Sequence, residues 1–154
     1  MSDLTHSESV IVAASPESLY DLVSDVTRVG EWSPECRAGW WDEGAGAKVG
    51  DWFTGRNESG ERTWETKSRI VVADRGKEFA WQVGGSYVRW GYTFAPVEDG
   101  TELTESWAVL PDGIAYLKEN FGAEADSAIE SRTAAARSGI RDTLAAIKKI
   151  AESS

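Results

Sequence analysis

The stretch AEADSAIESRTAAARSGIRDTLAAIKKIA, residues 123–151, decides the fold. At about 100° per residue its apolar side chains fall on one face of a helix, and most of its charged side chains fall on the opposite side. The apolar face comprises Ala125, Ile129, Ala136, Ile140, Leu144 and Ile147. Because such a helix gains most of its stability by packing this face on a partner, the rest of the chain must supply a complementary surface.

The partner surface is predicted to be an aromatic-rich sheet. The apolar face of the helix is thin, since it is rich in alanine and includes Thr133 and Thr143. All eight tryptophans precede the helix, mostly within strand-like runs. We therefore expect the helix to lie across a curved sheet, with a cavity between the small side chains of the helix and the sheet.

Composition narrows the class of protein. A length of 154 residues, with 41% hydrophobic and 27% charged residues, favours one domain spanning residues 1–154. No apolar run approaches the roughly 20 residues of a membrane helix, so no stable membrane insertion is expected. The beginning of the chain, MSDLTHSES, lacks the features of a signal peptide, and the single cysteine suits a reducing compartment, so a cytoplasmic location is expected. The net charge of −10 argues against nonspecific nucleic-acid binding.

The chain begins with a strand and two short helices. Val10, Ile11 and Val12 mark a strand at residues 5–14. Ser15 and Pro16 are favourable at the start of a helix, predicted at residues 16–24. Asp25 can cap a second short helix at residues 26–32.

Six further strands and the long helix complete the predicted order. The strands are separated by glycine-containing turn signals at hairpin spacing and are expected at residues 37–42, 51–57, 63–72, 78–83, 87–95 and 102–110. Residues 114–121 fit either a short helix or a loop. Consecutive strands joined by tight turns form an antiparallel meander, so the fold class is α+β, with six or seven strands wrapped on the long helix.

Residues 15–35, SPESLYDLVSDVTRVGEWSPE, resemble the opening of the START-like superfamily, specifically its polyketide cyclase/dehydratase and lipid-transport group (SRPBCC). The likeness rests on Pro16, Leu19, Leu22, Asp25 and the triplet Trp32-Ser33-Pro34, and on later stretches such as Arg89-Trp90-Gly91-Tyr92 and Gly100-Thr101-Glu102-Leu103-Thr104. The resemblance implies a helix-grip fold, in which seven antiparallel strands grip a C-terminal helix over a ligand cavity. It does not select a function, because the superfamily includes lipid carriers, hormone receptors, aromatases and cyclases.

Strand alternation predicts the residues that line this cavity. The inward strand positions are mostly aromatic with a few polar groups, as in small-molecule pockets. The predicted ligand-binding residues are Trp64, Thr66, Ser68, Phe79, Trp81, Trp90, Tyr92, Glu105 and Trp107 from the strands, with Ile129, Arg132, Thr133, Ala136 and Ile140 from the helix. The alternative interpretation is that these aromatic rings are ordinary core residues that brace a curved sheet.

Glu105 is the candidate catalytic residue, with Tyr92 as its partner. A carboxyl group among aromatic side chains has its charged form disfavoured, which suits acid–base chemistry on a phenol or ketone. Such a group must be protonated, hydrogen-bonded to Tyr92 or Thr66, or paired with Arg132. A slip of one residue in register would instead place Glu105 in water.

Other chemistries find little support in the sequence. His6 and Cys36 are the sole histidine and cysteine, and neither has a paired ligand or catalytic spacing, so no metal site and no cofactor are expected. The leading hypothesis is a carrier or sensor that binds a small hydrophobic molecule of aromatic, polyketide-like or lipid-like character. The alternatives are a cyclase, dehydratase or aromatase that uses acid–base catalysis, and an interaction module with a vestigial cavity. The oligomeric state is left open.

Overall fold

The computed structural model describes residues 4–153, so residues 1–3 and 154 of the expected domain lie outside the described part. Its elements are β1 (Thr5–Val12), α1 (Pro16–Val23), η1 (Val26–Glu31), β2 (Cys36–Trp41), β3 (Trp52–Ser59), β4 (Arg62–Asp74), β5 (Glu78–Val83), β6 (Val88–Val97), β7 (Gly100–Val109), α2 (Pro111–Phe121), η2 (Gly122–Glu124) and α3 (Ala125–Glu152). The predicted order of elements is confirmed.

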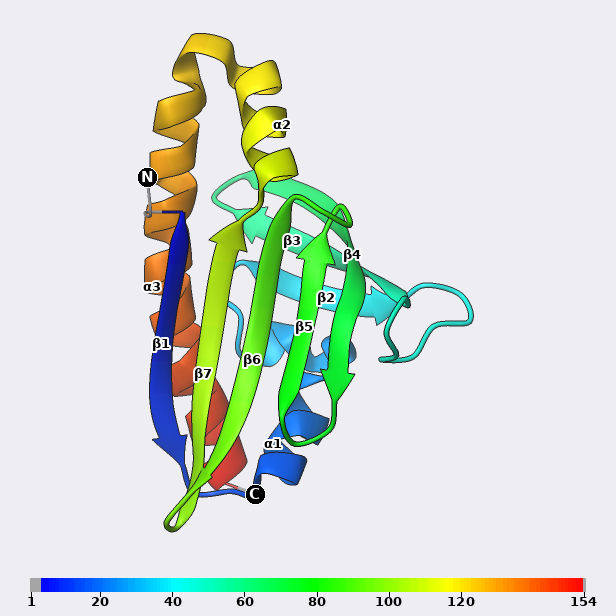
Figure 1. Ribbon diagram of the computed structural model, residues 1–154, viewed down its shortest axis with the longest axis vertical. Coiled ribbons are helices and arrows are strands. Elements are labelled where there is room, and N and C mark those ends of the chain that lie inside the picture. The colour runs from blue at the N-terminus through cyan, green and yellow to red at the C-terminus, as the bar shows by residue number, and fades with distance from the viewer. Residues whose placement is uncertain (1–3, 154) are drawn as a thin grey trace.

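All seven strands form one antiparallel sheet in the order β1-β7-β6-β5-β4-β3-β2. The register shifts in β4 between Ile70 and Val72, and such a bulge bends a strand and increases its twist. The sheet curls so far that β2 and β3 cross behind β5, β6 and β7 (Figure 1). The predicted α+β helix-grip fold is therefore confirmed, with seven strands.

Local capping explains the two short helices between β1 and β2. The Ser15 hydroxyl accepts a hydrogen bond from the backbone N–H of Ser18 at 3.1 Å, and Pro16 occupies the first turn of α1. The Asp25 carboxylate accepts from the N–H of Thr27 at 3.1 Å and so caps η1. Both predicted caps are present.

The segment between β7 and α3 is a helix, which settles an alternative that the sequence left open. Helix α2 begins at Pro111, and Gly113 in its first turn lies so close to the carbonyl oxygen of Tyr87 that a Cβ would collide with it. The rings of Tyr87 and Tyr116 stack at 5.1 Å. The long helix starts at Ala125, two residues later than expected, because η2 forms the bend between α2 and α3.

Helix α3 packs along β1 and, less extensively, on β7 and α1. The upper end is the end of the sheet near α2, and the lower end is that of the β6–β7 turn (Figure 1). Near the lower end, Ile140, Leu144 and Ile147 of α3 are almost completely buried in the main core. Near the upper end, Ile129 is only half-buried, so the helix closes the interior less tightly there.

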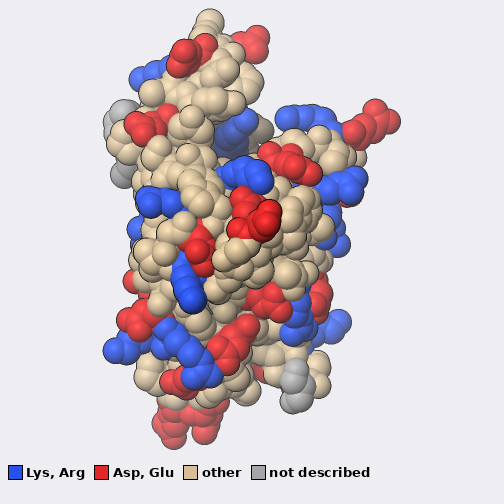
Figure 2. Space-filling model, turned by 90° about the vertical axis from the view of Figure 1, so that its right-hand side faces the viewer, with Lys and Arg blue, Asp and Glu red and all other residues tan. Residues whose placement is uncertain are grey.

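Seen from the side, the upper end of the molecule is hollowed between the tip formed by α2 and α3 and a neighbouring lobe with acidic and basic residues (Figure 2). Acidic side chains gather at the foot of the same face. Among residues 4–153, no helix is both long enough and apolar enough to cross a membrane.

The packing of α3 predicts a clear contrast in stability. Leu144→Ala should lower the free energy of unfolding by about 2–5 kcal/mol, because the buried side chain leaves a cavity in the core. Arg137→Ala, on the exposed side of the same helix, should change it by less than about 0.5 kcal/mol. Urea unfolding followed by circular dichroism measures both values, and equal effects would contradict this packing.

Candidate functional site

Tyr92 of β6 and Glu105 of β7 form a buried polar pair at the middle of the concave face. They are direct cross-strand partners, so alternation turns both side chains inward. Tyr92 is 3% exposed and Glu105 is 4% exposed, and the two side chains lie close enough for hydrogen bonding between them to shift both pKa values. The inward orientation predicted for Glu105 is therefore correct, and no slip in register moves it into water.

The surroundings of this pair favour neutral side chains. Burial raises the pKa of Glu105 well above its ordinary value, and the hydrogen bond from Tyr92 offsets this only in part. The pKa of Tyr92 is also raised well above its ordinary value, mainly by burial and then by the nearby carboxyl of Glu105. The interior thus holds a carboxylic acid and a phenol that both favour their protonated forms.

One oxygen of Glu105, Oε1, has no hydrogen-bond partner within residues 4–153. Buried polar atoms in proteins are nearly always hydrogen-bonded, because leaving one unsatisfied costs about 1–3 kcal/mol. Arg132, predicted as a possible partner, lies exposed on α3 with its guanidinium 5.3 Å from the centre of the Phe121 ring. The proposed Arg132–Glu105 pair is therefore wrong, because the side chain of Arg132 covers the tip of the helical hairpin.

Trp32 and Cys36 adjoin the pair and were missed by the sequence reasoning. Trp32 follows η1, is buried, and lies close enough to the Tyr92 hydroxyl for hydrogen bonding to lower the pKa of that hydroxyl slightly. Burial raises the pKa of the half-buried Cys36 to about 11, so its thiol stays protonated. The one signal for them in the sequence is the triplet Trp32-Ser33-Pro34, which carries the family resemblance but predicts no contact.

Aromatic rings form a wall beside the polar pair. Trp107 is buried and Phe79 is completely buried, whereas Trp81 and Trp90 are half-buried although they also point inward. Ring contacts at 5.7–6.4 Å link Phe79 with Trp81, Trp81 with Tyr92, Phe53 with Trp81 and Trp90 with Trp107. The wall therefore runs from the solid core at the lower end to partly exposed indole rings at the upper end.

The predicted residues of β4 lie on the inner face at the side of this wall. Ser68 is buried, and Thr66 is half-buried and accepts a hydrogen bond from Asn57 Nδ2 at 3.2 Å. Trp64 is half-buried, and the guanidinium of Arg62 lies 4.9 Å from the centre of its ring. Asn57 is buried and was another residue missed, since its inward orientation depends on the pairing of β3 with β4.

The helix residues predicted to close the cavity have different environments. Ala136 and Ile140 are buried and belong to the main core. Thr133 is buried, and its hydroxyl donates to the carbonyl of Ile129 at 2.8 Å, so it is already satisfied within the helix. Of this set, Ile129 is half-buried and lies nearest to the start of α3.

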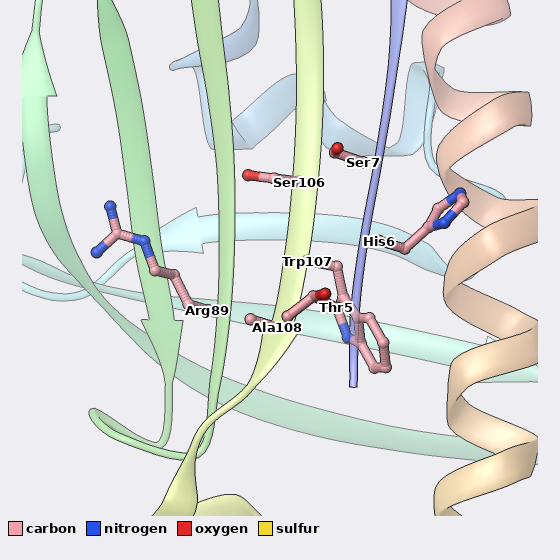
Figure 3. Close-up of a pocket in the computed structure, with 7 residues that line it drawn as sticks. All are labelled: Thr5, His6, Ser7, Arg89, Ser106, Trp107 and Ala108. Atoms are coloured by element: carbon pink, nitrogen blue, oxygen red, sulfur yellow. The ribbon is translucent and has the colours of Figure 1, made fainter. Parts of the chain in front are cut away.

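Two shallow surface depressions in the described part of the chain lie away from the polar pair. One, of about 290 Å³, lies on the outer face of β1, β6 and β7 (Figure 3) and is lined by Thr5, His6, Ser7, Arg89, Ser106, Trp107 and Ala108. The other, of about 210 Å³, lies at the loop between β2 and β3. In the described part of the chain, no group of three or more His, Cys, Asp or Glu residues is arranged to hold a metal ion.

Comparison with known proteins places the fold among cyclase-like proteins. The family model "Polyketide cyclase / dehydrase and lipid transport" matches residues 4–152. The solution structure of the Polyketide_cyc-like protein Cgl2372 from Corynebacterium glutamicum is 48% identical, with 96% of this chain and 90% of that chain covered and a TM-score of 0.72. No curated protein matches the chain.

More distant structures share the fold at low identity. The di-domain ARO/CYC protein StfQ of the steffimycin biosynthetic pathway is 15% identical, with 97% of this chain and 51% of that chain covered and a TM-score of 0.72. Protein CV1439 from Chromobacterium violaceum is 18% identical, with 97% of each chain covered and a TM-score of 0.67. At such identities the likeness shows the fold alone.

The buried carboxyl of Glu105 predicts a characteristic pH dependence. Its pKa is raised in the folded state above the ordinary 4.5, so its contribution to stability is fully present below about pH 4.5. That contribution is lost as the pH rises toward the folded pKa, by about 1.4 kcal/mol per pH unit.

The difference in unfolding free energy between the wild type and Glu105→Gln should therefore decline over this range. Urea unfolding of both proteins at a series of pH values measures it, and the other carboxyl groups cancel in the difference. Parallel stability curves would show that the carboxyl titrates normally.

Proposed function

The chain belongs to the polyketide cyclase/dehydrase and lipid transport family, and on that premise we propose that it binds a small hydrophobic molecule as a carrier or sensor. The ligand lies in the upper interior, between the inner faces of β4–β7 and the first half of α3. Its class is aromatic, polyketide-like or lipid-like. We also propose that the protein is cytoplasmic, as expected from its sequence.

The observation that carries the proposal is the unsatisfied Oε1 of Glu105 beside partly exposed tryptophans. A buried polar atom without a partner is unfavourable in a protein that needs only a core. A ligand with one polar group would satisfy that atom, and its apolar part would contact Trp81 and Trp90. Mostly apolar walls with a few placed polar groups are typical of small-molecule sites.

Burial also explains why the upper end is the place for the ligand. The lower half of α3 is sealed by Ile140, Leu144 and Ile147. The inward tryptophans at the upper end remain half-buried, and Ile129 in the first half of α3 is half-buried as well. A ligand that enters here would bury indole surface that the free protein leaves in contact with water.

Trp90 and Trp40 provide a matched pair of variants to test this site. Trp90 is inward and half-buried, whereas Trp40 of β2 is 40% exposed and points to the opposite face from Trp41, which packs on the core. Trp90→Ala should weaken binding of an apolar fluorescent probe by roughly tenfold, because it removes an aromatic contact. Trp40→Ala should leave the affinity unchanged.

The affinity is measured by saturable changes in probe emission during titration with protein. If no probe of any size binds to the wild type, the carrier or sensor function is wrong. The remaining interpretation would then be an interaction module with a vestigial cavity.

The hydrogen bond between Tyr92 and Glu105 favours a second candidate, an enzyme of the cyclase, dehydratase or aromatase type. Two groups with raised pKa values within hydrogen-bond reach can exchange a proton with a ketone or phenol. In this scheme Glu105 acts as general acid or base, and Tyr92 orients it. The carrier function remains the leading proposal. A carrier needs one anchoring polar group, whereas an acid–base enzyme needs a matched pair, and Tyr92 with Glu105 is the one such pair in the described interior.

Glu105→Gln separates the two functions. In an acid–base enzyme it should reduce kcat on a polyketide-like ketone by about 100-fold or more, while binding of the same compound is largely kept. Substrate loss and product formation followed by mass spectrometry measure the rate. A wild-type protein that binds the compound without converting it would exclude the enzyme and favour the carrier.

A further inference from the structure

The polar end of the interior contains a chain of three side chains from three separate segments. Trp32 follows η1, Tyr92 lies in β6 and Glu105 lies in β7. All three are buried, and Tyr92 and Glu105 are direct cross-strand partners. Trp32 and Glu105 both lie close enough to the Tyr92 hydroxyl for hydrogen bonding to shift its pKa. We propose that this chain has one direction, and that its free end, Glu105 Oε1, donates a hydrogen bond to a carbonyl oxygen of a neutral ligand. The inference rests on the proposed binding function and specifies the ligand's chemical class.

The direction of the chain follows from the hydrogen-bonding capacity of each group. An indole N–H can only donate, so Trp32 donates and the oxygen of Tyr92 accepts. The Tyr92 hydroxyl in turn donates to the carboxyl of Glu105. Trp32 is thus a positioning residue, because it turns the Tyr92 hydroxyl hydrogen toward Glu105.

The acid proton of Glu105 is left at the free end. In a neutral carboxyl group one oxygen carries a proton and the other accepts. The oxygen that accepts from Tyr92 is occupied, so the proton belongs on Oε1, which has no partner within residues 4–153. A buried O–H without an acceptor is complementary to a carbonyl oxygen.

The titratable groups around Glu105 do not supply a counter-charge. On β6 the neighbour is Tyr92, and Cys36 of β2 carries a thiol whose pKa is raised to about 11. On β1 the cross-strand partner is Glu8, whose carboxylate is 2.7 Å from His6 Nε2 and 3.7 Å from Nε of Arg141 on α3. The half-buried Glu8 is therefore already paired with His6 and Arg141, and among residues 4–153 no cation contributes to the pKa shift of Glu105.

A positively charged ligand is disfavoured by this arrangement. An ammonium group would have to ionise Glu105 in an apolar setting, against the desolvation that holds the carboxyl neutral. A neutral ketone needs no change of charge. The ring wall formed by Trp81 and Trp90 accepts the flat apolar part of either compound, so the polar group decides between them.

Three naphthalene probes of matched shape test the proposal by isothermal titration calorimetry: 2-acetylnaphthalene, 2-isopropenylnaphthalene and 1-(2-naphthyl)ethylamine. The ketone should bind about 3- to 10-fold more tightly than the hydrocarbon, as expected for one added hydrogen bond. The amine should bind more weakly than the ketone. Equal affinities for ketone and hydrocarbon, or tightest binding of the amine, would overturn the proposal. If none of the three binds, the binding function itself is what fails.

The pH dependence of ketone binding tests the roles of Glu105 and Trp32. In the wild type the affinity should fall as the pH rises through the folded pKa of Glu105, because the donor proton is lost. Glu105→Gln should abolish this pH dependence. Trp32→Phe should reduce the preference for the ketone and move the fall in affinity to higher pH, since the Tyr92 hydroxyl then stabilises the carboxylate less well.

The controls separate positioning from simple damage to the fold. Trp40→Phe should behave as the wild type, and Trp32→Phe should retain the wild-type affinity for the hydrocarbon. The carboxylic acid C=O band of Glu105, assigned by infrared difference spectroscopy between the wild type and Glu105→Gln, should shift in Trp32→Phe without any ligand. An unchanged band and an unchanged pH midpoint in that variant would show that Trp32 only fills space.

Discussion

The packing of α3 on the β1 and β7 side of the sheet is the constraint on which the other features depend. Four of the five large apolar residues of the helix, Ile140, Leu144, Ile147 and Ile150, lie in its second half. The first half presents mainly alanine and threonine, with Ile129 as its large apolar side chain. The helix therefore seals the lower interior with its own side chains. The upper interior is lined mostly by rings that belong to the sheet.

This division gives the carboxyl of Glu105 its unusual surroundings. The side chain lies between the sealed core and the partly open upper interior, beside Tyr92 on the next strand. A register slip of one residue would turn it outward, but it would also expose Leu103 and Trp107, which are buried on the same face. The apolar neighbours therefore hold the polar group in an environment that it would not adopt alone.

A neutral, inward carboxyl is unfavourable for stability at neutral pH and useful for recognition. Replacing it by an apolar residue would remove an unsatisfied atom from the core. Its presence, together with the Trp32 and Tyr92 hydrogen bonds, instead provides one oriented polar group in an aromatic interior. Family membership sets the fold that supports this group, while the function depends on the site itself.

Whether Glu105 faces inward was left open by the sequence, which allowed two registers, and the pairing of β6 with β7 decided it. The sequence by itself determined the order of elements, the α+β class, and the helix caps at Ser15 and Asp25. These depend on periodicity and capping over a few residues, which a single sequence shows directly. The tertiary structure decided that Trp32 contacts Tyr92, that Asn57 reaches Thr66, and that Arg132 covers Phe121 and not the interior. Those contacts depend on the curl of the sheet and the point at which α3 begins. They join segments far apart in the chain, or follow from the direction of a long flexible side chain, and local pattern carries no information on either.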